Sequence, residues 1–118
     1  FNILAHNRDD HARQFSYIME RDGSWRMAPA YDLTWSHGPG GEHSSSVLGH
    51  GKDITYEQLI ALGGKADMKK SDAARIIERI SEAVGKWKPF AGDYDVSKKS
   101  TDMIAFSLNK TLMAAHHR

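Results

Sequence analysis

The sequence predicts a mainly α-helical domain with one short β-hairpin near its N-terminus, and three observations lead to this prediction. Apolar residues recur at helical spacing in the second half of the chain. Two short runs of β-forming residues, 15–19 and 24–28, flank an Asp-Gly pair that is typical of a hairpin turn. A glycine- and serine-rich segment separates these two regions. We therefore divide the single domain of 118 residues into an N-terminal segment (1–35), a loop (36–54) and a helical part (55–118).

The composition is that of an ordinary globular domain, with 40% hydrophobic and 26% charged residues. The formal net charge is +1 and the basic residues are scattered, so we expect no direct binding to nucleic acid. Cysteine is absent, which excludes disulfides and thiolate metal sites and agrees with a cytoplasmic protein. No apolar run approaches the length of a membrane span, so we expect no membrane contact.

The helical part contains recognisable start and stop signals. Thr55 and Gln58 form a capping-box pattern at the start of a first helix, which we expect to end at residues 63–64, two glycines. Ser71 is expected to cap a second, longer helix. The apolar face of that helix is expected to carry Ile76, Ile80, Ala83, Val84 and Trp87.

Two further helices complete the expected fold. Pro89 suits the first position of a brief helix, and a final helix is expected from about Ser97. Its apolar stripe comprises Ile104, Leu108, Leu112 and Ala115. At the other end of the chain, residues 1–6 resemble the last turn of a helix and lack an initiator methionine, so we expect a fragment of a longer protein.

A polar loop, residues 7–16, lies between two apolar segments and carries the candidate chemistry. Arg8 and Asp9, followed by Gln14, match the outline of a protein-kinase catalytic loop, H-R-D-x-x-x-x-N. In that motif the aspartate accepts the proton of the substrate hydroxyl, and the asparagine binds Mg²⁺. Asp32 follows one hairpin later, where a kinase has its second metal-binding aspartate. Since a hairpin brings its two ends together, we expect Asp9, Gln14 and Asp32 to face one cleft.

The segment NRDDHARQFSYIM…DGSWRMAPAYDLT resembles the C-terminal part of the HipA-like serine/threonine kinases, which are toxins of bacterial toxin–antitoxin pairs. That family has the loop N-x-D-x-H-x-K-N-x-S, then a hairpin, a tryptophan and a PaYDl segment. The matching residues are Asn7, Asp9, His11, Arg13 (in place of Lys), Ser16, Trp25, Pro29, Tyr31, Asp32 and Leu33. The later stretch HSSSVLGHGKDITYEQLIALG is also similar to the family, so the resemblance covers nearly the whole chain.

The resemblance implies ATP- and Mg²⁺-dependent phosphorylation of a protein serine or threonine. It implies Asp9 as the catalytic base and Asp32 as the principal metal ligand. Gln14 would be a second metal ligand, and Gln14 and Asp32 would together bind the nucleotide through the metal. His11 and Arg13 would support the loop or the phosphates. The resemblance also implies a kinase-like helical C-lobe, and a DNA-binding antitoxin as a partner.

Two features depart from the family pattern. Gln14 replaces the usual asparagine, and its extra methylene moves the amide by about 1.5 Å. Mg²⁺ tolerates distorted octahedral geometry badly, so we expect this replacement to weaken or abolish activity. The Gly-rich loop, the ATP-binding lysine and its glutamate partner have no counterpart in this sequence. They would lie in an upstream lobe, so we expect the isolated chain to be inactive.

Two other functions remain open. The Gln14 replacement is compatible with a pseudokinase or a non-catalytic antitoxin-binding module. A metal-dependent hydrolase site is a lesser alternative, formed by His6, His11, His37, His43 and His50 with Asp9 and Asp10. Outside that alternative, we expect Asp10 to be a solvated loop acid or a cap. Three aromatic residues are expected to pack beneath the site: Trp25, Tyr31 and Trp35.

Overall fold

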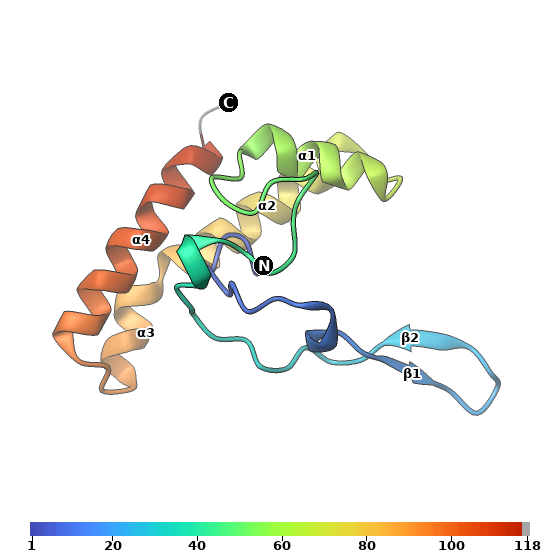
Figure 1. Cartoon of the computed structure of the whole chain (residues 1–118), viewed down its shortest axis with the longest axis horizontal. Coiled ribbons are helices and arrows are strands. Elements are labelled where there is room, and N and C mark those ends of the chain that lie inside the picture. The colour runs from blue at the N-terminus through green and yellow to red at the C-terminus, as the bar shows by residue number, and fades with distance from the viewer. Residues whose placement is uncertain (117–118) are drawn as a thin grey trace.

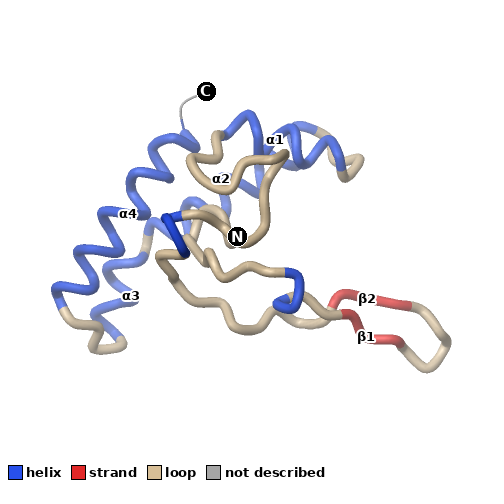
Figure 2. The backbone as a smooth tube through the Cα atoms, in the orientation of Figure 1, coloured by secondary structure: helices blue, strands red, loops and turns tan. Residues whose placement is uncertain are grey.

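A computed structural model describes residues 1–116 and has the mainly helical architecture, with one hairpin, that the sequence predicts (Figures 1 and 2). The helices pack against one another, whereas the hairpin projects away from them as an arm. No helix in this described range is both long and apolar enough to cross a membrane. The α-helices are α1 (Tyr56–Lys65), α2 (Lys70–Gly85), α3 (Trp87–Asp93) and α4 (Lys98–His116).

The hairpin arm pairs β1 (Tyr17–Met19) with β2 (Trp25–Met27) in antiparallel register, as expected. Tyr17 lies opposite Met27 and Met19 lies opposite Trp25, so these four side chains share one face. All four are between 55% and 65% exposed, because neither strand packs against a helix of the described chain. Trp25 therefore does not pack beneath the site, contrary to our expectation.

The core forms where α2 crosses the N-terminal segment and α1. Leu4 and Ile77 are buried at its centre, and Tyr56, Leu59, Ile60 and Ile80 pack around them. The buried face of α2 comprises Ala73, Ile77 and Ser81. The predicted face is confirmed in part: Ile80 packs against the core, and Val84 and Trp87 are half-buried. Ile76 and Ala83 are exposed instead, because the buried face is centred on Ile77.

The last helix agrees with its predicted stripe. Ile104, Leu108 and Leu112 are buried, while the side chain of Ala115 lies outside the part of the chain that the structure describes. Ser97 caps the helix, since its Oγ accepts a hydrogen bond from the backbone N–H of Ser100 at 3.2 Å. Trp87 fixes α3 against α4 by donating its indole N–H to the carbonyl of Thr101.

Helix boundaries differ from the prediction at several points. The capping box of α1 is present, with both hydrogen bonds between Thr55 and Gln58. Gly63 and Gly64 lie inside α1 rather than ending it, and the left-handed residue after the helix is Asp67, at φ = 55°. Gly63 is required by packing instead, because a Cβ at this position would lie 2.9 Å from the Cβ of Ala73 on α2.

Three smaller corrections concern the element ends. Helix α2 begins at Lys70 with Lys69 as its N-cap, so Ser71 lies in the first turn and does not cap it. Pro89 is the third residue of α3 rather than the first. Residues 1–6 form hydrogen-bonded turns instead of the end of a helix.

Candidate functional site

Ser36 holds the backbone of the polar loop at Arg8 and Asp9. Ser36 Oγ accepts hydrogen bonds from the backbone N–H groups of Arg8 and Asp9, at 2.9 and 3.1 Å. The N–H of Ser36 in turn donates to the carbonyl of His6. This arrangement fixes the backbone of Asp9 and leaves its side chain 59% exposed, 3.6 Å from His11 Nε2. The candidate base is therefore accessible on an anchored loop.

Gln14 and Asp32, the two predicted metal ligands, contact each other directly. The Gln14 side-chain amide donates a hydrogen bond to Asp32 Oδ2 at 2.5 Å. The loop and the second segment are also joined by Tyr31, whose hydroxyl donates to the carbonyl of Arg13 at 2.7 Å. The hairpin between them thus brings its two ends together, as the sequence predicts.

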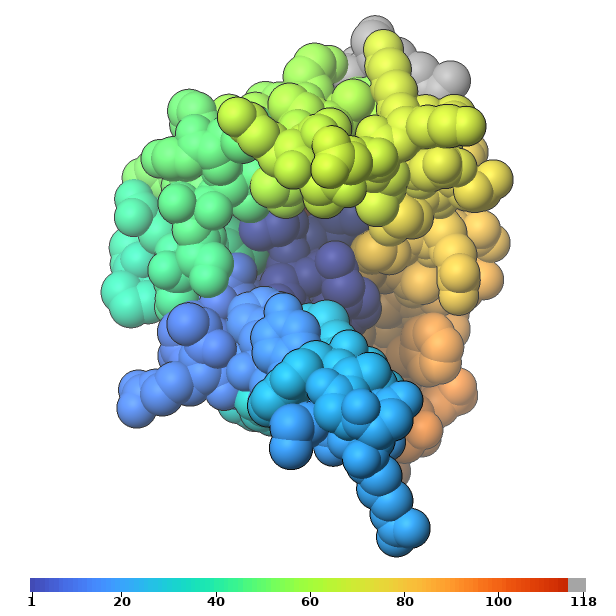
Figure 3. Space-filling view, turned by 90° about the vertical axis from the view of Figure 1, so that its right-hand side faces the viewer, coloured from blue at the N-terminus to red at the C-terminus, as the bar shows by residue number. Residues whose placement is uncertain are grey.

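Asp9 has its own contact, with His11, and no hydrogen bond joins it to Gln14 or Asp32 among the described residues. Gln14 lines a cavity of about 210 Å³, together with Tyr31 and Leu33 from the segment after β2, but neither Asp9 nor Asp32 is among its lining residues. Figure 3 shows this end of the molecule, hollowed between the hairpin arm and the helices α1 and α2, with N-terminal residues at the floor. The side chain of Arg13 is exposed.

The donor chemistry of this pair suits Mg²⁺. A carboxylate and an amide supply hard oxygen ligands, which Mg²⁺ prefers. They come from two chain segments that the Gln14–Asp32 hydrogen bond holds together. Asp32 itself has a positive φ of 51°, a backbone conformation that aspartate tolerates better than most residues. The residues present therefore fit the cation that the sequence motif implies.

Asn7 ties the start of the loop to the same region. Its side chain is buried, and its amide nitrogen donates to Asn2 Oδ1 at 3.1 Å and to the carbonyl of Asp32 at 3.5 Å. The side-chain oxygen of Asn7, Oδ1, is buried without a hydrogen-bond partner in the described chain. The family resemblance includes Asn7 as a matching position but implies no role for it.

Asp10 differs most from its expected state, because it is 3% exposed rather than solvated. Its carboxylate accepts hydrogen bonds from the backbone N–H of Ser45 at 3.1 Å and from His43 Nδ1 at 3.1 Å. The hydroxyl of Ser45 donates to the carbonyl of Asp10 as well. Burial lowers the pKa of His43, and the adjacent Asp10 carboxylate opposes that shift. The polar loop is thus clamped to the glycine- and serine-rich segment.

His6 connects the loop to the last helix. It is buried, and its two ring nitrogens contact the hydroxyls of Ser107 and Thr111 on α4, at 2.8 and 2.6 Å. Burial lowers the pKa of His6 from 6.5 to about 4, and the positive charge of Arg8 acts in the same direction. His6 is therefore a neutral structural residue near pH 7.

The hydrolase alternative finds no geometric counterpart in residues 1–116. No group of three or more His, Cys, Asp or Glu side chains in this range is arranged to hold a metal ion. Two of the histidines have other partners, since His6 contacts α4 and His43 contacts Asp10.

The matching residues of the loop, the hairpin and the segment after it belong to one known family. The family model of the HipA-like C-terminal domain matches residues 1–87, so the chain belongs to this family. The match includes every candidate site residue: Asp9, His11, Arg13, Gln14 and Asp32. No curated protein and no solved structure shows significant similarity to the chain.

Proposed function

We propose that this chain supplies the catalytic loop and metal-binding residues of a HipA-like serine/threonine protein kinase, which transfers the γ-phosphate of ATP to a protein. The observation that carries this proposal is the contact between Gln14 and Asp32, because it joins two predicted ligands that lie 18 positions apart in the sequence. The helical part then corresponds to the C-lobe of a kinase-like fold. Such a kinase would act in the cytoplasm.

In this proposal Asp9 is the general base. Its carboxylate accepts the hydroxyl proton of the substrate serine or threonine, while the hydroxyl oxygen bonds to the γ-phosphorus and ADP leaves. The accessible side chain and the anchored backbone of Asp9 support this role. His11, 3.6 Å from the carboxylate, would orient it, and the exposed Arg13 would contact the phosphates.

Asp32 and Gln14 would hold Mg²⁺ through a carboxylate oxygen and the amide oxygen. When bound, Mg²⁺ neutralises negative charge on the ATP phosphates. Gln14 contributes a second effect that the family asparagine would not, because its amide nitrogen occupies one oxygen of Asp32. Asp32 would therefore have to give up this hydrogen bond in order to offer both of its carboxylate oxygens to the metal.

The test uses the full-length protein and measures phosphate transfer from radiolabelled ATP to protein. Asp9→Asn and Asp32→Asn are each expected to lower the rate at least 100-fold, as loss of a base or a metal ligand does. Asp93→Asn is the matched control, because Asp93 is an exposed acid at the end of α3. An Asp9→Asn variant that retains the wild-type rate would contradict the assignment of the base.

The Gln14–Asp32 hydrogen bond favours a second candidate, a non-catalytic protein that binds a DNA-binding antitoxin. The same assay separates the two candidates. Transfer by Gln14→Asn but not by the wild type would identify a pseudokinase. In that case the antitoxin complex, followed by size-exclusion chromatography, should persist in both Asp9→Asn and Gln14→Asn. Loss of the complex in either variant would argue against a separate binding module.

A further inference from the structure

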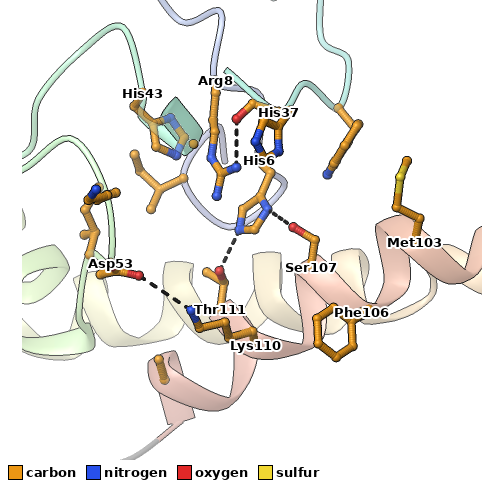
Figure 4. Close-up of a pocket in the computed structure, with 16 residues that line it drawn as sticks. His6, Arg8, His37, His43, Asp53, Met103, Phe106, Ser107, Lys110 and Thr111 are labelled. Atoms are coloured by element: carbon orange, nitrogen blue, oxygen red, sulfur yellow. Dashed lines mark hydrogen bonds and ion pairs between the residues drawn. The ribbon is translucent and has the colours of Figure 1, made fainter. Parts of the chain in front are cut away.

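A cavity of about 600 Å³ lies between the polar loop and α4 (Figure 4). Neither Gln14 nor Asp32 lines this cavity, so it is separate from the proposed metal site. Its volume is in the range of sites that bind small molecules, roughly 300–1,000 Å³. The proposed kinase reaction assigns no role to this cavity.

The charge of the cavity wall is predominantly positive. Arg8, Lys52 and Lys110 line it together with one acid, Asp53. Lys52 also forms an ion pair with Glu42, 3.6 Å apart, in which both side chains are more than half exposed, so this pair neutralises the lysine only weakly. The Asp53–Lys110 pair is 4.0 Å apart, with both side chains at least 75% exposed, so it neutralises little. A small anion would therefore experience a net attraction.

Among the described residues, Arg8 is the cation of this wall that forms no ion pair within 4 Å. Burial lowers the pKa of Arg8, and the more distant Asp53 carboxylate opposes that shift. One of the terminal nitrogens of Arg8 donates to the carbonyl of His37 at 2.9 Å. Its Nε is buried without a hydrogen-bond partner, and no carboxylate lies within 4 Å of the guanidinium among the described residues. A guanidinium presents several N–H donors in a planar fork that matches the oxygens of phosphate. The buried, unpaired donor of Arg8 thus indicates an oxyanion as the ligand.

Another side of the same cavity is apolar. Met103 and Phe106 lie on α4, apart from Arg8 and His43 in Figure 4. Phe106 is 80% exposed, so its ring is accessible to a ligand in the cavity. A ligand that combines an anionic group with an apolar group would satisfy both sides of the cavity.

We propose that this cavity binds a phosphate-bearing small molecule, with the phosphate on Arg8 and Lys52 and its apolar part against Met103 and Phe106. His43 lies in the same wall with its Nδ1 held by Asp10, so its other ring nitrogen remains for the ligand. Burial lowers the pKa of His43 and so favours the neutral ring, whose Nε2 can accept a hydrogen bond from a phosphate hydroxyl when Nδ1 carries the proton. The proposal does not depend on the kinase activity.

The experiment titrates the full-length protein with phenyl phosphate and with inorganic phosphate by calorimetry. We expect phenyl phosphate to bind more tightly, and Arg8→Met to weaken both ligands at least tenfold. Phe106→Ala should weaken phenyl phosphate alone. Arg79→Met, at an exposed position on α2, is the matched control and should change neither affinity. Absence of wild-type binding at millimolar ligand, or equal losses in Arg8→Met and Arg79→Met, would overturn the proposal.

Two further measurements guard against misfolding and binding elsewhere. Lys110→Glu changes an exposed residue at the cavity and should weaken phosphate at least threefold, even if Arg8→Met fails to fold. An unchanged affinity in Lys110→Glu would count against the site. In NMR spectra, the ring signals of His43 should shift with phenyl phosphate while the side-chain amide of Gln14 does not. The reverse pattern would assign the ligand to the proposed metal site instead.

Discussion

The side-chain amide of Gln14 donates a hydrogen bond to the carboxylate of Asp32 at the base of the hairpin arm, with 2.5 Å between the two atoms. In the antiparallel hairpin, Tyr17 pairs with Met27 and Met19 pairs with Trp25. This register aligns the segments that enter and leave the hairpin and so brings Gln14 and Asp32 together. The hairpin therefore has a positional role for the site, although its own side chains are mostly exposed.

Gln14→Asn is expected to raise the affinity of the protein for a divalent cation severalfold. The shorter side chain cannot maintain the present hydrogen bond without a shift of about 1.5 Å, so both oxygens of Asp32 become available. Binding of Mn²⁺ as a substitute for Mg²⁺, measured by electron paramagnetic resonance, checks this without an activity assay. Asp32→Asn should abolish the binding, and unchanged Mn²⁺ affinity in that variant would contradict the site.

Two adjacent aspartates should differ sharply in their effect on stability. Asp10→Ala removes the acceptor of His43 and of the Ser45 N–H in a buried position, and should lower the free energy of unfolding by about 3 kcal/mol. Asp9→Ala changes an exposed side chain and should alter it by no more than about 0.5 kcal/mol. Urea denaturation of both variants measures the difference. Equal losses would show that Asp10 is not the structural anchor.

The stability of the wild-type protein should fall as the pH decreases from about 6.5 to about 4. The folded-state pKa of His6, about 4, is lower than its unfolded value of 6.5, so in this window the unfolded state binds a proton that the folded state does not. The contribution of the neutral His6 side chain to the free energy of unfolding is therefore fully present above pH 6.5, and up to roughly 3 kcal/mol of that free energy is lost below pH 4.

His6→Asn tests this pH dependence, because asparagine accepts the left-handed backbone at φ = 50°. The variant should be less stable at pH 7, since the contacts with Ser107 and Thr111 are lost. It should also show a smaller fall in stability between pH 6.5 and pH 4. His50→Asn, at an exposed position, is expected to keep the wild-type slope. An identical slope in His6→Asn would exclude His6 as the cause.

Substitution of the two glycines of α1 by alanine should change the stability of the fold in opposite directions. Gly63→Ala places a Cβ 2.9 Å from that of Ala73 and should destabilise the fold by about 1–3 kcal/mol, despite the better helix propensity of alanine. Gly64→Ala has no atom within 4 Å of the new Cβ and should stabilise it by about 0.5–1 kcal/mol. Thermal unfolding measures both, and a Gly63→Ala variant as stable as Gly64→Ala would contradict the close crossing of α1 and α2.

The features predicted correctly from the sequence depend on neighbours along the chain. The capping box of Thr55 and Gln58 spans four residues, and the hairpin depends on the turn at Gly23, whose φ is 83°. The Gln14–Asp32 contact was predictable because a hairpin fixes which residues meet at its base. Membership of the HipA-like C-terminal domain family also followed from motif residues in this region.

The features that were missed depend on contacts between distant segments. Asp10 meets His43 and Ser45 after more than 30 intervening residues, and no local pattern distinguishes it from Asp9. Ile76 and Ile77 are adjacent and chemically identical, so helical periodicity alone does not determine which one faces Leu4 in the core. The Gly63–Gly64 pair is typical of a helix end, and only the contact with Ala73 on α2 shows that Gly63 is required for packing.

The inward orientation of Asp10 also changes the electrostatic character of the polar loop. The sequence has two consecutive carboxylates, but only that of Asp9 reaches the solvent. The other is enclosed with an imidazole and a backbone N–H, which donate the hydrogen bonds that water would otherwise supply. Under the proposed function, an approaching polyphosphate would therefore meet one solvent-facing carboxylate on this loop instead of two, so only Asp9 could come into direct contact with it.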